Sequence, residues 1–315
     1  MDVLGNLVCN LRRLRTQENN TKRRKQMERK TTKHAIGNVY YFLNEYLQEH
    51  KGENLKVSGI EFSNLGAQGR EPLFDVSRSQ KGTIMAYWKD DSKKCIVITT
   101  PEPGFEVKAQ QNMEYFFYNS EYSSFLISHL DVTHLDVSNV TNFANCFSEF
   151  GSAFGKSSKS KIVGLETWDV SKGEIFNHMF YGAFPVNDAV ELNLSAWRFG
   201  QQAKIWFWSM FGCFAQKAKT VILDTTGWNT TNVNNFDSMF FKFAPSAEIV
   251  EIKGIENWRL GTGRICLRDT FKDFAKTSSS RLDLSEWARE CTEAPDMEGF
   301  TVGTFFRIKE PAWAN

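Results

Sequence analysis

Trp228-Asn-Thr-Thr-Asn-Val-Asn-Asn-Phe236-Asp-Ser-Met-Phe240-Phe-Lys-Phe243 is the clearest copy of a pattern that recurs six times from about Leu130 onward. Each copy places a large apolar residue at a corner, then a polar run rich in Ser, Thr and Asn, then spaced aromatic residues. The corner residues are separated by 33, 29, 31, 30 and 29 residues, and they are Leu135, Trp168, Trp197, Trp228, Trp258 and Trp287. Self-similarity at this period predicts a solenoid, in which each unit buries its apolar face against its neighbours.

The part of each copy before the corner predicts a short strand. Leu282-Asp283-Leu284 alternates apolar and polar residues with period two, as a strand with one buried face does. The same slot recurs at 130–132, 163–165, 192–194, 223–225 and 253–255. Parallel stacking of these strands predicts a sheet along one face of the chain.

The part after the corner predicts a short helix. Side-chain oxygens of the Ser, Thr and Asn run can satisfy the first N–H groups of a helix, and the apolar residues that follow are spaced as one helical face. These triplets, which we expect in the core, are Phe143/Phe147/Phe150, Phe176/Phe180/Phe184, Phe207/Phe211/Phe214, Phe236/Phe240/Phe243 and Leu267/Phe271/Phe274. The predicted fold class is therefore an α/β repeat solenoid, leucine-rich-repeat-like, with a parallel sheet on one face and short helices on the other.

Two phrases carry a resemblance to a known family. Leu135-Asp-Val-Ser-Asn-Val-Thr-Asn-Phe143 and the copy that begins at Trp228 resemble the BspA-like leucine-rich-repeat family, over Leu130 to about Phe300. The units here are longer than that family's, and the 27 phenylalanines are more than its usual load. The resemblance implies a repeat array that binds host or matrix proteins, with no enzymatic activity of its own, and a surface location.

The rest of the chain divides into three predicted parts. Residues 1–35 form a basic arm, residues 36–120 a small α+β domain that caps the array at 121–306, and residues 307–315 a tail. Within 36–120 we expect an amphipathic helix over 36–49 and strands near 55–62, 73–77, 83–88 and 95–99. A cap is expected because an open end of such an array exposes apolar core and strand edges.

Two surfaces of the array are candidate protein-binding sites. The first is a small, acidic strip of residues at the outward strand position, comprising Asp131, Gly164, Asn193, Asp224, Gly254 and Asp283. It would receive a basic partner, or the chain's own arm. The alternative is that these residues form a solvated face that suits turns.

The second surface consists of aromatic residues beside the core positions. Trp206 and Trp208 flank the core residue Phe207, about 100° to either side on a helix, so that a one-faced helix cannot bury both. Tyr181 and Phe241 follow core phenylalanines in the same way. Exposed aromatic residues that gather in a patch indicate a partner site. The alternative is that the long segments between units cover them.

The basic arm supports a different function. Ten cations against two Glu give the segment between Leu11 and His34 a local charge of +8, in a chain whose formal net charge is +1. Such a segment can neutralise phosphates in a salt-dependent manner, although no aromatic residues are interleaved to stack on bases. The candidate nucleic-acid-binding residues are Arg12, Arg13, Arg15, Lys22, Arg23, Arg24, Lys25, Arg29, Lys30 and Lys33. The alternative function is an intracellular nucleic-acid-associated or host-inhibitory protein.

Catalysis, cofactors and membrane insertion are not predicted. The five histidines show no metal-binding spacing, no glycine loop is built to hold phosphate, and no cofactor or metal is expected. The six cysteines are scattered, and we expect all of them to be reduced. No apolar run is long enough to span a membrane, and no secretory signal is seen, so that a cytoplasmic protein is expected. The first function predicted is a non-enzymatic protein that binds a protein partner through its array.

Overall fold

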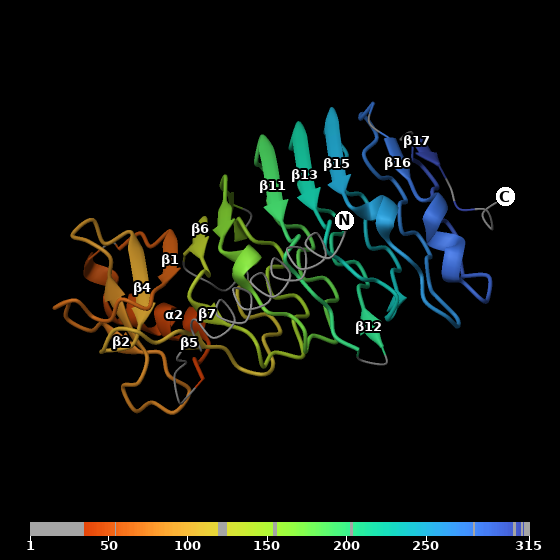
Figure 1. Cartoon of the computed structure of the whole chain (residues 1–315). Helices are drawn as coiled ribbons and strands as arrows, with labels where there is room; N and C mark the ends of the chain where they lie inside the picture. The colour runs from red at the N-terminus through yellow and green to blue at the C-terminus, as the bar shows by residue number, and fades with distance from the viewer. Residues whose placement is uncertain are drawn as a thin grey trace, which may run out of the picture.

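The computed structural model describes residues 35–53, 55–118, 125–153, 156–201, 204–279, 281–304, 307–309 and 311. Its N-terminal part holds a helix, α2 (Val39–Glu49), a 3-10 turn, η1 (Lys51–Glu53), and part of a six-stranded sheet (Figure 1). The sheet order is β10 (Lys161–Val163), β6 (His129–Asp131), β1 (Gly59–Phe62), β4 (Cys95–Thr99), β3 (Met85–Trp88), β2 (Phe74–Asp75).

Helix α2 confirms the helix predicted over 36–49. It begins where Asn38 accepts a hydrogen bond from the backbone N–H of Tyr41, 3.1 Å away, which satisfies one of the free N–H groups of the first turn. Val39, Tyr40 and Leu43 are buried in the core, and the opposite side of the helix faces solvent. The helix thus covers the N-terminal end of the core with one apolar face.

The six-stranded sheet crosses the predicted boundary at residue 120. Strands β1 to β4 confirm the four strand segments expected before it, and β1 pairs in parallel with β6, whose Leu130 lies opposite Ile60. Strand β6 belongs to the first repeat, and it pairs on its other side with β10 of the second. The region predicted as a cap is therefore joined to the repeats by a continuous set of backbone hydrogen bonds.

The remaining strands form five small sheets. The largest is the parallel sheet β11 (Ala189–Asn193), β13 (Thr220–Asp224), β15 (Ile249–Lys253), whose three strands lie side by side (Figure 1). Four two-stranded sheets complete the set: β16 (Arg281–Asp283) with β17 (Arg307–Lys309), β12 (Ile205–Trp206) with β14 (Val233–Asn235), β5 (Val107–Lys108) with β7 (Leu135–Asp136), and β8 (Ser152–Ala153) with β9 (Lys156–Ser157). Strand β17 lies in the predicted C-terminal tail.

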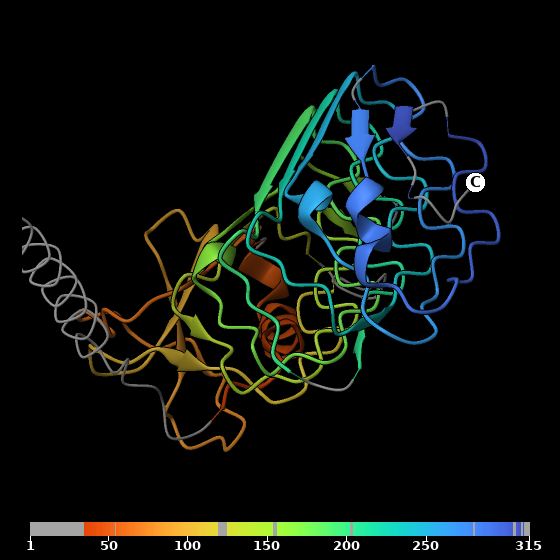
Figure 2. The ribbon, with the colours of Figure 1, turned by 45° about the vertical axis from the view of Figure 1, so that its right-hand side comes forward.

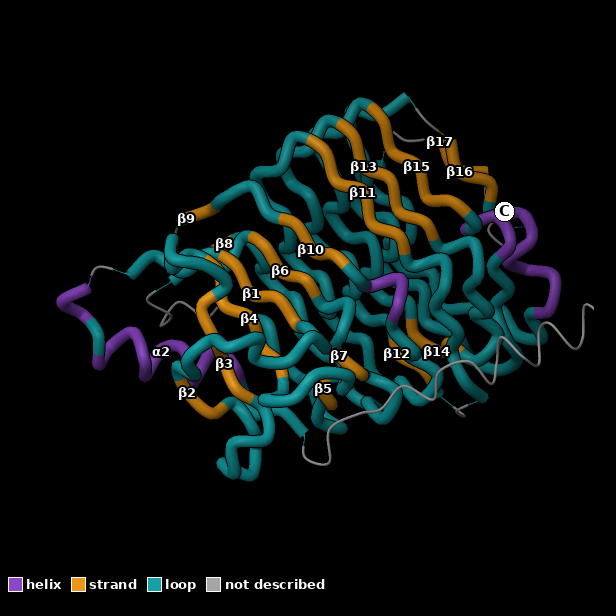
Figure 3. The backbone as a smooth tube through the Cα atoms, turned by 60° about the vertical axis from the view of Figure 1, so that its left-hand side comes forward, coloured by secondary structure: helices purple, strands orange, loops and turns teal. Residues whose placement is uncertain are grey.

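The prediction of an α/β repeat solenoid is wrong. The strands belong to several separate sheets, and in the part of the chain that the structure describes no row of helices lies opposite them; that side is formed by loops and turns (Figure 3). Within the described residues, α2 is the one α-helix. Three 3-10 segments, η2 (Leu165–Thr167), η3 (Ile255–Asn257) and η4 (Ser285–Glu290), are the other helical elements after η1.

The aromatic segments are strings of turns instead of helices. In the copy that starts at Phe143, Asn145 and Glu149 have φ of +54° and +56°, a left-handed conformation that a helix does not contain. The N–H groups of Cys146 and Ser148 donate to the carbonyls of Phe143 and Asn145, three residues earlier, as in β-turns. The same alternation recurs in the following copies and produces the regular stacked loops of Figure 2.

The N–H groups not used within the turns join each copy to the next. Those of Phe143, Asn145, Phe147 and Glu149 donate to carbonyls of the following copy over 2.7–2.9 Å, and the same every-second-residue pattern continues as far as Asp273. We call this set of bonds the turn ladder. It accounts for the backbone donors that the predicted helices would have satisfied internally.

The predicted core residues are confirmed as buried, and they stack in columns. All six corner residues and all five triplets are at most 5% exposed. In the central column, Phe180 lies 5.2 Å from Phe147 and 5.4 Å from Phe211, ring centre to ring centre, with nearly parallel planes. Trp168, Trp197, Trp228, Trp258 and Trp287 form a second column with spacings of 5.4–6.5 Å. Aromatic stacking between copies therefore supplies much of the core.

Four indoles of the tryptophan column donate a hydrogen bond to a carbonyl of the preceding copy. The indole Nε1 of Trp197 lies 2.8 Å from the carbonyl oxygen of Leu165. The Nε1 of Trp258 is buried without a hydrogen-bond partner among the described residues. A buried hydrogen bond contributes about 0.5–1.5 kcal/mol, and loss of one partner leaves the other unsatisfied.

Trp197→Phe is therefore expected to lower the free energy of unfolding by about 1–2 kcal/mol more than Trp258→Phe. Both substitutions remove the same part of the ring, but only the first leaves a buried carbonyl, that of Leu165, without its donor. Urea unfolding of the two variants measures the difference. Equal losses of stability would contradict the finding that the Trp258 indole lacks a hydrogen-bond partner.

Strand pairing is interrupted at two glycines. Strands β6, β11, β13 and β16 end in an Asp or Asn, and each pairs with the strand of the next copy. Strands β10 and β15 are instead followed by Gly164 and Gly254, with φ of +93° and +86°, which start the 3-10 segments η2 and η3. Neither β10 nor β15 pairs with the strand of the following copy. The strand side thus divides into three blocks, although the turn ladder is unbroken.

Candidate functional site

The residues of the predicted acidic strip are used to close turns. One side-chain oxygen of each Asp or Asn accepts hydrogen bonds from the backbone N–H and the hydroxyl of the residue two positions later. The pairs are Asp131 with Thr133, Asn193 with Ser195, Asp224 with Thr226, and Asp283 with Ser285. This is the Asx-turn that the alternative interpretation anticipated.

The predicted strip is also not continuous. The register places Val163 beside Asp131, and Lys253 beside Asp224, so that Gly164 and Gly254 lie one position beyond the strip. Asp283 accepts from Lys309 Nζ at 2.9 Å. Hydrogen bonds from Ser285, followed by the interaction with Lys309, lower the pKa of Asp283 to about 2. The strip is an alternation of acidic, apolar and basic residues, which does not favour a basic partner.

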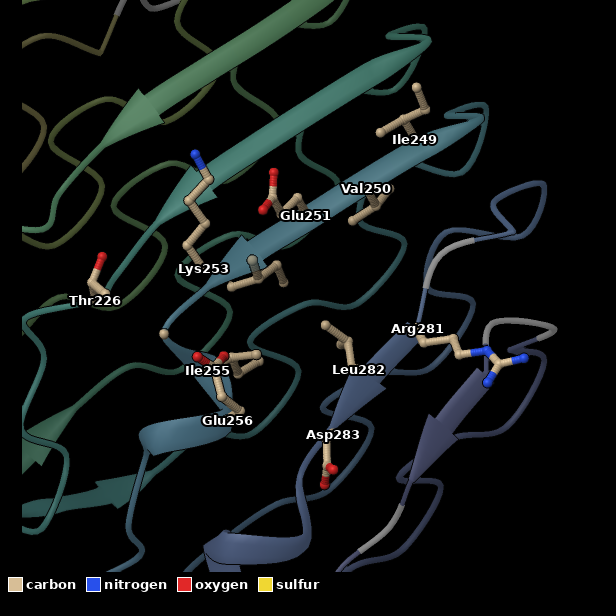
Figure 4. A pocket seen from close by; sticks show the side chains of 12 residues that line it. Thr226, Ile249, Val250, Glu251, Lys253, Ile255, Glu256, Arg281, Leu282 and Asp283 are labelled. Carbon is tan, nitrogen blue, oxygen red and sulfur yellow. The ribbon is translucent and has the colours of Figure 1, made fainter.

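A groove opens where β15 and β16 fail to pair (Figure 4). It encloses about 600 Å³ between the side chains of β15, such as Glu251 and Lys253, and those of Arg281, Leu282 and Asp283. Its charges are mixed, and Asp283 already has two partners. The groove is therefore an opening in the strand side without a group poised for one kind of ligand.

Three of the four predicted aromatic residues lie together in a second cavity. Tyr181, Trp208 and Phe241 line a hollow of about 530 Å³ on the turn side, which we call the aromatic hollow. Its other lining residues are Tyr115, Tyr118, Asn145, Ser148, Glu149, His178, Ser209 and Ser238. Trp206 does not line the hollow, but it is 44% exposed, beside Trp208 at 45%. The described segments between copies therefore do not cover these tryptophans.

The geometry expected for the two tryptophans was wrong in detail. Trp206 lies in strand β12, and the residues on either side of it, Ile205 and Phe207, are fully buried. Trp206 and Trp208 are thus exposed by the alternation of an extended chain, and not by flanking a core residue on a helix. Trp206 and Trp208 are therefore exposed as predicted, but because the backbone is extended and not because it is helical.

Large and small residues alternate along the stack beside the aromatic hollow. In each copy, one residue directly follows the phenylalanine of the central column in the sequence. In successive copies this residue is Tyr118, Ser148, Tyr181, Gly212 and Phe241. A Cβ on Gly212 would lie 2.9 Å from the ring of Tyr181, so the glycine leaves room for that ring. Ser148, the small residue between Tyr118 and Tyr181 in this row, is buried although it lines the hollow.

The aromatic rings around the hollow contact one another. His178 lies 4.7 Å from Trp208 and 5.4 Å from Tyr181, ring centre to ring centre, in edge-on geometry. The Tyr181 hydroxyl is 3.4 Å from the Cys213 thiol; this hydrogen bond, followed by burial, raises the pKa of Tyr181 to about 12. Burial lowers the pKa of His178, which favours its neutral form. The aromatic side chains of the walls are therefore uncharged at neutral pH.

Among the described residues, Glu149 is the one carboxylate that lines the hollow, and the sequence did not indicate it. It is half-buried, and it makes no ion pair with any residue that the structure describes. A Cβ on Gly182 would lie 2.4 Å from its Oε1, so the carboxylate packs directly over that glycine. Burial raises the pKa of Glu149, because the charged form is deprived of water.

Glu149→Gln is therefore expected to stabilise the protein at neutral pH. A carboxyl group whose pKa is higher in the folded state imposes no penalty when it is protonated in both states. It destabilises the fold as the pH rises through the carboxyl range. The gain in melting temperature should be larger at about pH 7 than at about pH 4. Thermal melts at both pH values measure it, with Glu191→Gln, on the exposed side of β11, as the control. A gain that does not change with pH would contradict the burial of this charge.

Four further predictions concern the basic arm, the cysteines, metal binding and membrane insertion. The ten cations of the arm lie outside the described residues. Five of the six cysteines are free thiols, as expected, and Cys9 is outside the described part. Within the part of the chain that the structure covers, no three His, Cys, Asp or Glu side chains are grouped to hold a metal ion. No helix in that part has the length and apolar character needed to cross a membrane.

The fold and the hollow define a protein of stacked aromatic repeats with an aromatic cavity on its turn side. Two overlapping segments, residues 98–212 and 150–287, match DUF285, described as "Mycoplasma protein of unknown function". Together they cover more than half of the chain, which therefore belongs to the DUF285 family. No curated protein and no solved structure matches it.

Proposed function

We propose that this chain is a non-enzymatic binding protein that engages a protein partner through its stacked repeats, at the aromatic hollow. The observation that carries the proposal is the exposure of large aromatic side chains around one cavity: Tyr115 is 49% exposed and Trp208 is 45% exposed. Tyrosine and tryptophan dominate the energetic centres of protein interfaces, because each buries a large area with few rotatable bonds.

The rigidity of the hollow also supports this function. Its residues sit on the turn ladder, and their rings are held by contacts such as that of Tyr181 with Cys213. A preorganised surface loses less conformational entropy on binding. A cytoplasmic location is part of the proposal and is supported by the five free thiols, which are typical of reducing compartments. The resemblance to BspA-like repeats, whose members bind proteins, supports the protein-binding function.

Affinity capture from a lysate of the producing cells tests the proposal. The wild-type chain should retain one protein in stoichiometric amount after nuclease treatment, and Trp208→Ala with Tyr181→Ala should abolish that recovery. Tyr41→Ala is the matched control, because Tyr41 is an exposed aromatic residue on α2, outside the hollow. Loss of recovery with Tyr41→Ala alone, or unchanged recovery with the double variant, would contradict a role for the hollow.

The basic arm supports the second candidate function, nucleic-acid association, through its local charge of +8. Binding of this kind weakens steeply as salt rises and depends on the cations between Arg12 and Lys33. Replacement of those ten residues by Gln should abolish it, and substitutions in the hollow should leave it unchanged. The capture experiment therefore separates the two functions when it is repeated with this variant.

A further inference from the structure

We infer that the aromatic hollow is a receptor for the guanidinium group of an arginine side chain, presented by the protein partner. This inference rests on the proposed function and names the chemistry that the hollow recognises. Two features carry it: an unpaired, half-buried carboxylate on the lining, and aromatic rings on the surrounding walls.

The carboxylate of Glu149 requires a cation. It is held over Gly182 in a partly desolvated position, and no described Lys, Arg or His lies within 4 Å of it. Removal of water from a charge is costly unless a partner of opposite charge replaces the water. A cationic ligand in the hollow would supply that partner. Binding would then relieve the cost that the folded protein bears in the empty state.

The walls favour a cation that is flat. Tyr115, Tyr118, Tyr181, Trp208 and Phe241 offer π-systems, which attract cations over their faces. One lining ring already makes a contact of this kind, because Lys242 Nζ lies 5.0 Å from the centre of the Phe241 ring. A planar guanidinium can stack on an aromatic ring and donate two hydrogen bonds to one carboxylate, which a Lys ammonium cannot do.

The hollow is large enough for one such group. Successive rings of the central column are 5.2–5.4 Å apart from Phe117 to Phe211, so each copy contributes a layer of that thickness. The hollow extends over several copies, because Tyr115, Glu149 and Phe241 all line it. Its volume of about 530 Å³ is large enough for one guanidinium group. Because Glu149 is part of the lining, a flat cation within the hollow can reach its carboxylate.

A titration of the full-length chain with Nα-acetyl-arginine amide tests the inference. The probe is followed by NMR through the indole resonance of Trp208, which is assigned by its loss in Trp208→Phe. We expect saturable millimolar binding, and binding of Nα-acetyl-citrulline amide about tenfold weaker, because citrulline has the same shape without the charge. Glu149→Gln should remove this preference. Glu114→Gln, a nearby exposed carboxyl group outside the hollow, should retain it.

The other outcomes overturn the inference in distinguishable ways. Equal binding of the two amides would mean that the hollow is an aromatic platform without charge selection, and the protein-binding function would stand. No response of Trp208 to either amide would remove arginine as the ligand, while the capture experiment decides the function independently. Binding seen only after the ten cations of the arm are replaced by Gln would show that the chain's own arm occupies the hollow.

Discussion

Phe180→Ala is expected to lower the free energy of unfolding by about 3–5 kcal/mol, the range for large aromatic deletions in packed cores. Phe180 is fully buried, and its ring stacks between those of Phe147 and Phe211. The cavity left by its removal is bounded by the turn ladder on both sides. The N–H of Phe180 donates to the carbonyl of Met210, and those of His178 and Gly182 also donate to carbonyls of the next copy. The backbone therefore cannot easily collapse into the space.

Urea unfolding followed by tryptophan fluorescence measures this loss. Tyr41→Ala, which removes a ring that is 58% exposed, is the control and should change stability by less than about 1 kcal/mol. Similar losses in the two variants would mean that the columns do not carry the stability of the stack. A transition that splits into two steps in Phe180→Ala would indicate that copies on the two sides unfold separately, as repeat arrays can.

Gly254→Ala is the second substitution with a large expected effect, roughly 2–5 kcal/mol. Its φ of +86° is unfavourable for any residue with a side chain, and an added Cβ would lie 2.5 Å from Thr226 Cα of the preceding copy. The obstacle is backbone, so that no side-chain rotation relieves it. The strain and the overlap act together at this position.

Gly263→Ala is a matched control for that experiment. Its φ is +91°, but an added Cβ meets nothing within 4 Å. Its expected cost is the conformational part alone, about 1–2 kcal/mol. The difference between the two melting temperatures isolates the close approach of two copies at Gly254. No difference would show that the conformation alone, and not the contact with Thr226, requires glycine there.

Periodicity predicted the buried residues correctly and their backbone wrongly. The triplets recur at intervals of three or four residues, which is the spacing of a helical face, and all of them are buried. A string of turns gives the buried residues the same spacing when its left-handed residues lie two or four positions apart. The sequence gives a weak indication of these turns. One left-handed position is occupied by Asn145, Ser238 and Asp269 in different copies, and by Gly299 in the last copy. Asn, Asp and Gly tolerate that conformation better than most residues.

The site was predictable only in its aromatic part. Tyr181, Trp208 and Phe241 were indicated because they follow or precede core positions. Glu149 and His178 come from adjacent copies, and their approach to these rings depends on the register of the turn ladder. A helical backbone would have directed them elsewhere. The turns closed by the side-chain oxygens of the acidic strip depend on the backbone in the same way, and a count of charges does not reveal them.

The two interruptions after Gly164 and Gly254 have a mechanical consequence. Hydrogen bonds run continuously along the turn side, but the strand side is divided between β10 and β11 and again between β15 and β16. We therefore expect the stack to bend most readily at these two lines. Such bending would widen or narrow the groove of Figure 4, whereas the aromatic hollow, on the continuously bonded turn side, would keep its shape.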